Sequence, residues 1–413
     1  MTIFSAADLL IPKEEYLPQW AVVACDQYTS QPDYWERVKN YAGDAPSTLN
    51  LILPEAQLKA PGKEQKIENI HSTMASYKDS QMFRAYPHSF LYIERVMHDG
   101  AIRRGLVGVI DLDQYAYTDK NDAKIRATEK TVVERIAPRK AVRQDSALDM
   151  SHVILLADDS KDLILGSLES KKTQLPKVYD FDLMERGGHI TGWLVEKDQA
   201  AALEEKLQQY ENGMAELCRN QGKAELFYAV GDGNHSLASA KACYEKLLET
   251  KTADQLKNDP RRYALVELEN IHDTTQDFEP IHRIVDTENP MAFLKLMQEK
   301  CCSDSGYPVK WFAGDASGVV YLDSSKGKSA VSIIQAFLDG ALSDVTTQLD
   351  YIHGDDVVES LAKAPNKLGI ALPAILKDDF FGALIADGVL PRKTFSIGQA
   401  QEKRFYLETR VLL

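Results

Sequence analysis

Blocks of apolar and polar residues follow one another along the chain with two different periods. Apolar runs of strand length occupy 90–98, 101–112, 151–159, 188–196 and 262–271. Amphipathic stretches of helical spacing occupy 53–83 and 198–213, the second ending at Gly213. After residue 290, helical pieces such as AVSIIQAFLDGAL alternate with short strands such as GVVYLD. The chain therefore interleaves strands and helices throughout.

The order of these elements predicts a fold class. Asp99-Gly100 separates two strand-like runs, which is a strong hairpin signal, so the sheet is not purely parallel. We therefore expect a mixed α/β (α+β) fold, with a mixed sheet, hairpins and flanking helices. A chain of 413 residues exceeds one ordinary core, which predicts subdomains. We place these at 1–150, 151–290 and 291–413, the middle one carrying the site described next.

One short stretch concentrates polar chemistry between a strand and a helix. Residues 226–230 are apolar without alternation, as in a strand covered on both faces, and an amphipathic helix pattern starts at 235. The connection reads GDGNHS. Its residues are Gly231, Asp232, Gly233, Asn234, His235 and Ser236.

A strand that enters a helix through glycines exposes backbone N–H groups at the positive end of the helix dipole. Such turns bind anions, phosphates above all, and glycine lets the ligand approach the backbone. The stretch matches neither GxxxxGK[ST] nor GxGxxG. A capped helix start is the alternative, but a cap does not require Asp232 and His235 as well. We therefore expect a phosphate or substrate site.

A basic segment, KIRATEKTVVERIAPRKAVR (124–143), stands out in an acidic chain. It carries seven Lys or Arg, among them Arg126 and Arg139, against Glu129 and Glu134. A solvated helix face with i,i+4 ion pairs explains this pattern as well as an anion site does. Thr128 and Glu129 suit an anion site that needs one carboxylate, as a base or for a metal.

In a third polar stretch, DTTQDFEPIHRIVD (273–286), Pro280 is expected to break the chain, and a β-run with His282 and Arg283 follows it. Neighbouring residues of a strand face opposite sides, so only one of the two would point at a given ligand. The other histidines show no metal-ligand spacing, which argues against zinc. No GxSxG elbow supports hydrolase chemistry of that type.

Charge and cysteine usage restrict the partners and the compartment. The net charge of −14 argues against a general nucleic-acid or anionic-membrane surface. No apolar stretch reaches the length of a membrane span, and the amino terminus shows no signal-peptide pattern. Five scattered cysteines without CxxC fit a reducing cytoplasm. The sequence leaves the oligomeric state open, a homo-oligomer included.

Five segments together resemble the DUF1015 family of uncharacterised proteins. They are DQYTSQPDYW (26–35), RATEKTVVERIAPR (126–139), YAVGDGNHSLASAK (228–241), ALVELENIHD to FEPIHRIV (264–285) and GVLPRKTFSIGQAQEKRFYLETR (388–410). In many members the glycine turn is similar to Asp-Gly-His-His-Arg, a motif shared with ParB/sulfiredoxin-like free-serine kinases, whose loop cradles nucleotide phosphates. Asp232, Gly233 and His235 match that motif, whereas Asn234 and Ser236 replace its first His and its Arg. Thr128-Glu129 resembles a family His-Glu-x-Thr-like stretch, with Ala127 in place of His.

The resemblance implies a ParB/sulfiredoxin-like core and a nucleotide-dependent phosphotransferase for a small hydroxylated metabolite, with free L-serine as the specific candidate. It implies ATP or ADP and Mg²⁺ as cofactors. The expected catalytic residues are Asp232, His235 and Glu129, of which Asp232 and Glu129 also hold the metal. The expected binding residues are Gly231, Gly233, Asn234, Ser236, Arg126, Arg139, His282 and Arg283. The alternative is a non-catalytic nucleotide-binding regulator, favoured by the departures from the motif; DNA binding conflicts with the acidic charge.

Overall fold

A computed structural model describes most of the chain. The described residues are 2–29, 31–54, 57–58, 60–118, 122–129, 131, 135–150, 152–275, 278–327, 329–341, 348–391 and 393–413. They form two compact units, one of Met1–Gln276 with Gln399–Leu413 and the other of Asp277–Gly398. In sequence, the second unit is therefore an insertion in the first. None of the described helices is long and apolar enough to span a bilayer.

This division differs from the three regions expected from the sequence. The expected boundary at residue 150 falls inside the first unit, because β7 (Leu148–Met150) and β8 (Ile154–Ala157) belong to the same large sheet. The expected boundary at 290 falls inside the second unit, just after β13 (Phe278–Asp286). The last 15 residues return to the first unit, which a division into consecutive segments does not capture.

The first unit is built on a sheet in which 13 strands are described. Its main path runs β5-β6-β11-β8-β12-β4-β3-β2-β20-β7, with β1, β10 and β9 joined to it at the side. Besides β7 and β8, the strands are β1 (Phe4–Ser5), β2 (Ala7–Pro12), β3 (Phe83–Val96), β4 (Ile102–Asp111), β5 (Tyr115–Ala116), β6 (Ile125–Ala127), β9 (Lys177–Asp182), β10 (His189–Val195), β11 (Tyr228–Asp232), β12 (Tyr263–Asn270) and β20 (Thr409–Val411). Both parallel and antiparallel pairs occur, for example β11 with β6 and with β8.

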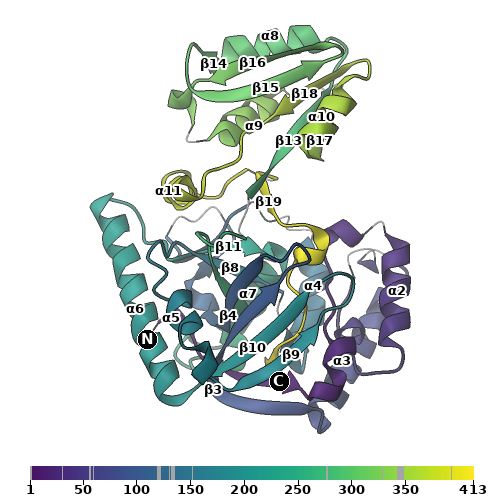
Figure 1. The fold of residues 1–413 in the computed structure, drawn as a ribbon, viewed down its shortest axis with the longest axis vertical. Helices are drawn as coiled ribbons and strands as arrows, with labels where there is room; N and C mark the ends of the chain where they lie inside the picture. The colour runs from purple at the N-terminus through teal and green to yellow at the C-terminus, as the bar shows by residue number, and fades with distance from the viewer. Residues whose placement is uncertain are drawn as a thin grey trace. The chain divides into compact units, whose positions relative to one another are not determined.

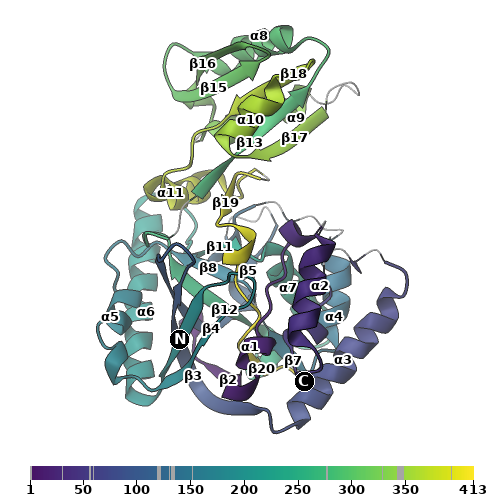
Figure 2. The same cartoon turned by 45° about the vertical axis from the view of Figure 1, so that its right-hand side comes forward.

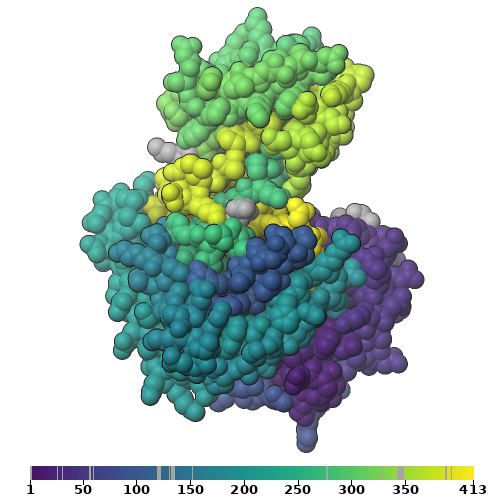
Figure 3. Space-filling view, in the orientation of Figure 1, coloured from purple at the N-terminus to yellow at the C-terminus, as the bar shows by residue number. Residues whose placement is uncertain are grey.

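The predicted hairpin forms the middle of this sheet. β3 and β4 pair antiparallel from Leu91↔Val107 to Val96↔Ile102, and Gly100 takes φ 87° in the turn between them. β10 pairs with the other edge of β3, and β9 pairs with β10. Figure 3 shows these strands side by side on one face, blue for the hairpin and teal for β9 and β10.

Helices flank the large sheet on two sides. In Figures 1 and 2, α5 (Leu165–Glu169) and α6 (Lys197–Asn220) lie on one side, whereas α2 (Pro32–Ala42), α3 (Lys63–Asp79) and α4 (Ile136–Gln144) lie on the other. The short α1 (Leu17–Trp20) precedes α2, and α7 (Asn234–Leu248) follows β11 and packs against α4. The large sheet and its flanking helices confirm the mixed α/β class.

The second unit has its own sheet and helices on both faces of it. The strand order is β14-β16-β15-β18-β13-β17, with β19 paired to β13. The remaining strands are β14 (Cys302–Ser303), β15 (Tyr307–Ala313), β16 (Ala316–Leu322), β17 (Gln348–His353), β18 (Lys367–Ala371) and β19 (Phe395–Ile397), and the helices are α8 (Pro290–Cys301), α9 (Ala330–Ala341), α10 (Asp355–Ala362) and α11 (Lys377–Asp387). Val285 joins the core with α8 and α9, while its neighbour Ile284 joins a separate core with α10. Since neighbouring residues of a strand face opposite sides, α8 and α9 pack on one face of the sheet and α10 packs on the other.

The sequence expectations for individual elements hold, with three corrections. α6 continues through Gly213 to Asn220, because Met214, Ala215 and Cys218 extend its buried face. The region expected to be helical over 53–83 contains α3, which is shorter, and then the start of β3. Pro280 does not break the chain but lies within β13, paired with Phe395 of β19.

Candidate functional site

The GDGNHS connection lies where β11 passes into α7. β11 is held between β6, parallel to it, and β8, antiparallel to it, and Tyr228, Ala229 and Val230 are fully buried. Gly233 is the N-cap residue of α7 and has φ 82° and ψ 21°, in the left-handed region. A Cβ at Gly233 would lie 2.9 Å from Cγ2 and 3.0 Å from Cα of Val153. Only glycine fits here, for both conformational and steric reasons.

The start of α7 has no side-chain cap. Gly233 has no side chain to accept a hydrogen bond, and its carbonyl oxygen accepts the Leu237 N–H at 3.1 Å. The earlier N–H groups of a helix, here from Asn234 to Ser236, have no acceptor within the helix itself. With the dipole of a 15-residue helix behind them, they favour an anion. The Oδ1 atom of Asn234 is also buried and has no hydrogen-bond partner among the described residues.

Asp232 is the last residue of β11. One oxygen of its carboxylate contacts the turn and the other lies near the carboxy-terminal tail. Its Oδ1 accepts the N–H of Gly233 at 2.9 Å. Its Oδ2 lies 3.6 Å from Nζ of Lys403, and the Asp232 side chain is 30% exposed. The carboxylate thus combines an ordered position with access to solvent.

His152 approaches the turn from the chain that precedes β8. Its Nε2 and the Oγ of Ser236 share a hydrogen bond of 3.3 Å, and its ring lies 4.6 Å from that of Tyr406. Burial lowers the pKa of His152 to about 4, and the positive charges of Arg139 and Arg404 act in the same direction while Asp232 opposes them. At neutral pH the imidazole is therefore uncharged.

The predicted pair Thr128 and Glu129 lies at the carboxyl end of β6. Oγ1 of Thr128 donates to the carbonyl oxygen of Val230 at 2.7 Å, which ties this end of β6 to β11. Because β6 and β11 are parallel, their carboxyl ends share one edge of the sheet. Asp232 is the last residue of β11 and Glu129 comes two residues after β6, so both belong to that edge. The topology therefore supports grouping the two carboxylates.

The two predicted arginines of the basic segment differ. Arg126 is 2% exposed, and its guanidinium donates to the carbonyl oxygens of Ala123, Ala224 and Glu225 at 2.8, 3.2 and 3.1 Å. Arg126 therefore links Ala123 to the segment 224–225, and we do not include it in the candidate site. Arg139 lies in α4, which packs on α7, and its charge acts on His152. Arg139 therefore stays in the candidate site.

His282 and Arg283 belong to the second unit and have their contacts there. His282 accepts the N–H of Leu372 at Nδ1 (3.1 Å), and its Nε2 lies 2.8 Å from Oδ1 of Asp355 in α10. Arg283 donates from Nε to Gln335 of α9 at 3.2 Å. The two side chains face opposite sides of β13, as the alternation predicts. Both side chains are buried and held by these contacts, so we do not include the two residues in the candidate site.

No group of three or more His, Cys, Asp or Glu among the described residues is arranged to hold a metal ion. Mg²⁺ is usually bound by one or two carboxylates together with substrate phosphates and water, so it does not require such a group. Asp232 and Glu129 suit that mode, and their role as metal ligands stays a prediction.

Three residues of the site were not selected from the sequence: His152, Lys403 and Tyr406. A local signal for the last two is the composition of the tail KRFYLETR (403–410), whose basic and aromatic residues fit an approach to something anionic and a sheet edge equally well. Nothing in the local sequence distinguishes His152, since its partners Ser236 and Tyr406 are remote in the chain.

A family model described as a protein of unknown function, DUF1015, matches residues 4–359. The chain belongs to the DUF1015 family. No curated protein matches it. Solved structures similar to this DUF1015 chain include SbnI with a C-terminal truncation from Staphylococcus aureus, at 12% identity and a TM-score of 0.36, covering 73% of this chain and 82% of that one. A mutant free serine kinase in complex with ADP has 12% identity and a TM-score of 0.38, covering 74% and 91%. These likenesses are distant and concern the fold alone.

Proposed function

We propose that the turn at 231–236 binds the phosphates of ATP or ADP and that the protein transfers a phosphoryl group to a small hydroxylated metabolite, free L-serine being the specific candidate. The observation that carries this proposal is the start of α7, which begins at a left-handed glycine without a side-chain cap hydrogen bond and is flanked by Asp232 and His235. The match of Asp232, Gly233 and His235 to the Asp-Gly-His-His-Arg motif supports the proposal from the sequence.

Each residue of the site has a defined task under this proposal. The backbone N–H groups at the start of α7, from Asn234 onward, hold phosphate oxygens, and Gly231 keeps the end of the strand open to the ligand. Arg139 offsets charge that develops on the transferred group. Asp232 or Glu129 orients the attacking hydroxyl or binds Mg²⁺, which would supply charge neutralisation on the phosphates.

His235 is the residue whose role is most directly measurable. A side chain that donates to a phosphate oxygen in the transition state contributes on the order of 2–4 kcal/mol, so His235→Ala should lower kcat/KM by about 30- to 1000-fold. His189→Ala is the control, because His189 pairs with Asp180 and Asp182 on the surface of β9 and β10. Equal kcat/KM in wild type and His235→Ala would remove His235 from the site.

A non-catalytic nucleotide-binding regulator is the second candidate. Ser236 replaces a charged residue of the motif and is bonded to His152, which leaves the turn itself without a Lys or Arg. Binding of a nucleotide without turnover of any hydroxylated metabolite, serine first, would favour the regulator.

Thermal-shift titration with ATP, ADP, AMP and pyrophosphate, each with and without Mg²⁺, tests the shared premise. A ligand at about 100 times its Kd adds roughly 2.7 kcal/mol to the stability of the folded state. A shift in wild type and in His189→Ala that is lost in His235→Ala places the phosphate at the turn. The absence of a shift with every phosphate compound would leave the turn as a helix start and refute both candidates.

A further inference from the structure

The carboxy-terminal tail, residues 399–413, reaches the candidate site from a remote part of the sequence. After the second unit, the chain re-enters the first unit at Gln399. Four residues later, Nζ of Lys403 lies 3.6 Å from Oδ2 of Asp232. Its side chain is only 12% exposed, so the ammonium group is held at the turn rather than extended into solvent.

Two buried arginines hold the backbone of the tail around Lys403. Arg95 donates from Nη1 to the carbonyl oxygens of Glu402 and Lys403 at 3.1 and 2.9 Å, and from Nη2 to that of Gln401. Arg103 donates from Nη2 to the same Glu402 oxygen. Both arginines are 5% exposed. We call this pair, Arg95 and Arg103, the guanidinium clamp.

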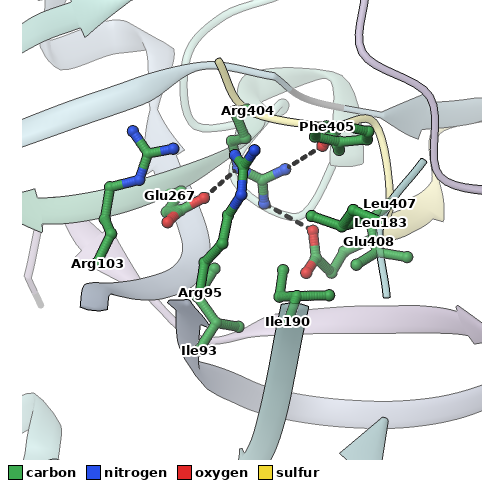
Figure 4. A pocket seen from close by; sticks show the side chains of 10 residues that line it. All are labelled: Ile93, Arg95, Arg103, Leu183, Ile190, Glu267, Arg404, Phe405, Leu407 and Glu408. Carbon is green, nitrogen blue, oxygen red and sulfur yellow. Dashed lines mark hydrogen bonds and ion pairs between the residues drawn. The ribbon is translucent and has the colours of Figure 1, made fainter. Parts of the chain in front are cut away.

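The next residue of the tail is anchored by charge. Arg404 places Nε 2.7 Å from Glu267 and Nη2 2.6 Å from Glu408, and Glu408 also accepts the hydroxyl of Tyr179 at 2.6 Å. Figure 4 shows Arg404 between the two carboxylates, with Arg95 beside it. These residues line a cavity of about 20 Å³. That volume accommodates about one water molecule. The cavity is therefore part of a packed anchor and does not hold a substrate.

The far side of the tail is fixed to the core as well. The N–H of Tyr406 donates to the carbonyl oxygen of Val22 at 2.8 Å, and the ring of Tyr406 packs against His152. Lys403 is thus fixed by the clamp on its own backbone, by the Arg404 ion pairs one residue later and by Tyr406 beyond them. A buried ion network is costly to assemble. Here the network positions the ammonium group of Lys403 at the turn.

The charge balance of the turn shows what that ammonium group can do. Residues 231–236 contain Asp232 but no Lys or Arg, and Arg126 is directed at carbonyl oxygens instead. A lysine ammonium has three donors, so it can bind a carboxylate and a phosphate oxygen at the same time. Lysine also binds phosphates as a compact point charge.

We propose that Lys403 is a phosphate-binding residue of the turn, supplied by the carboxy-terminal tail and positioned by the guanidinium clamp. This inference rests on the proposed function. In the bound state, Nζ contacts a phosphate oxygen while it stays beside Asp232. The ligand recognised is a di- or triphosphate, because the backbone N–H groups of α7 and Lys403 reach the anion from two different parts of the chain.

The test is the affinity for pyrophosphate and for ADP, measured by calorimetric titration on the full chain. Lys403→Met removes the charge and keeps most of the side-chain volume, and Lys403→Arg keeps the charge. A hydrogen bond to a charged group predicts that Lys403→Met raises Kd by about 10- to 100-fold. Lys403→Arg should stay within a few-fold of wild type, and adenosine should bind all three proteins alike.

Lys124→Met is the matched control. Lys124 is also an ion-paired lysine, 3.3 Å from Glu225, and it precedes β6, so it lies at the opposite end of the strand from Glu129. The control reports the general effect of losing one positive charge and should leave Kd nearly unchanged.

The outcomes separate this inference from the proposed function. Wild type that binds neither pyrophosphate nor ADP would refute the proposed function itself. Wild type that binds, together with Lys403→Met of equal affinity, would overturn the inference alone. A lower Tm of ligand-free Lys403→Met with unchanged Kd would also overturn it, since Lys403 would then be only the ion-pair partner of Asp232. If Lys403→Met fails to fold, Lys403→Gln is measured against the same control.

Discussion

The substitution Gly233→Ala tests the geometry of the turn most directly. An L residue in the left-handed region costs about 1–2 kcal/mol. The new methyl group would lie 2.9 Å from Cγ2 and 3.0 Å from Cα of Val153, and overpacking of this kind costs about 1–3 kcal/mol. The two terms sum to about 2–5 kcal/mol, a large part of the 5–15 kcal/mol typical of a folded domain.

Urea unfolding followed by circular dichroism measures this loss as a lower midpoint at an unchanged m-value. Gly213→Ala is the control with the opposite sign. Gly213 lies exposed inside α6, its φ is not positive, and a Cβ there would meet nothing within 4 Å. Alanine should therefore stabilise α6 by about 0.5–1 kcal/mol. A Gly233→Ala protein within 0.5 kcal/mol of wild type would refute the described geometry.

A double-mutant cycle separates the two contributions. In a Val153→Ala background the contact with Cγ2 disappears, while the left-handed conformation and the contact with Cα stay. Gly233→Ala should then cost about 1 kcal/mol less than it does in wild type. An unchanged cost would assign the effect to the backbone conformation and the contact with Cα, and none of it to the contact with Cγ2.

Two further predictions concern buried charge. Arg404→Met leaves Glu267 and Glu408 buried without their cation and should destabilise the protein by about 3–5 kcal/mol in urea unfolding; Arg37→Met, which breaks an exposed pair with Glu185, should change stability by less than about 1 kcal/mol. The pKa of His152 is depressed from 6.5 to about 4, so the folded state binds its proton less readily than the unfolded state. The free energy of unfolding should therefore keep its full value above pH 6.5 and decrease as the pH falls towards 4. In a His152→Gln protein the free energy of unfolding should depend less on pH in that window.

Local sequence carried the information for the strands, the helices and the turn. The hairpin followed from Asp99-Gly100, and the unbroken apolar run before Gly231 identified β11, because periodicity and turn chemistry act over a few residues. The predicted helix end at Gly213 was wrong because one glycine costs only about 1 kcal/mol. The buried face of the 24-residue helix outweighs that cost. Pro280 fits near the start of β13 because, in the described part of the chain, only β19 pairs with the strand there; the pairing with β17 begins at Ile281 and that with β18 at Arg283. A strand start with one open edge tolerates a missing N–H.

The composition of the site depended on contacts that local sequence does not encode. Arg126 lies in a segment rich in positive charge, but three carbonyl oxygens surround it. Lys403 is 171 positions after Asp232 in the chain and reaches it only through the returning tail. Sequence reasoning could identify the tail as basic and aromatic, but not its neighbour.

The insertion of residues 277–398 into the first unit has a consequence for biosynthesis. The ribosome completes β11, the turn and α7 long before it reaches the tail, because the whole second unit is translated in between. At a typical elongation rate of about 5–20 residues per second, the turn waits on the order of ten seconds for Lys403. During this interval the nascent first unit lacks β20, and Glu267 has no Arg404. We therefore expect the candidate site to reach its full affinity for the ligand only after residues 399–413 have been translated.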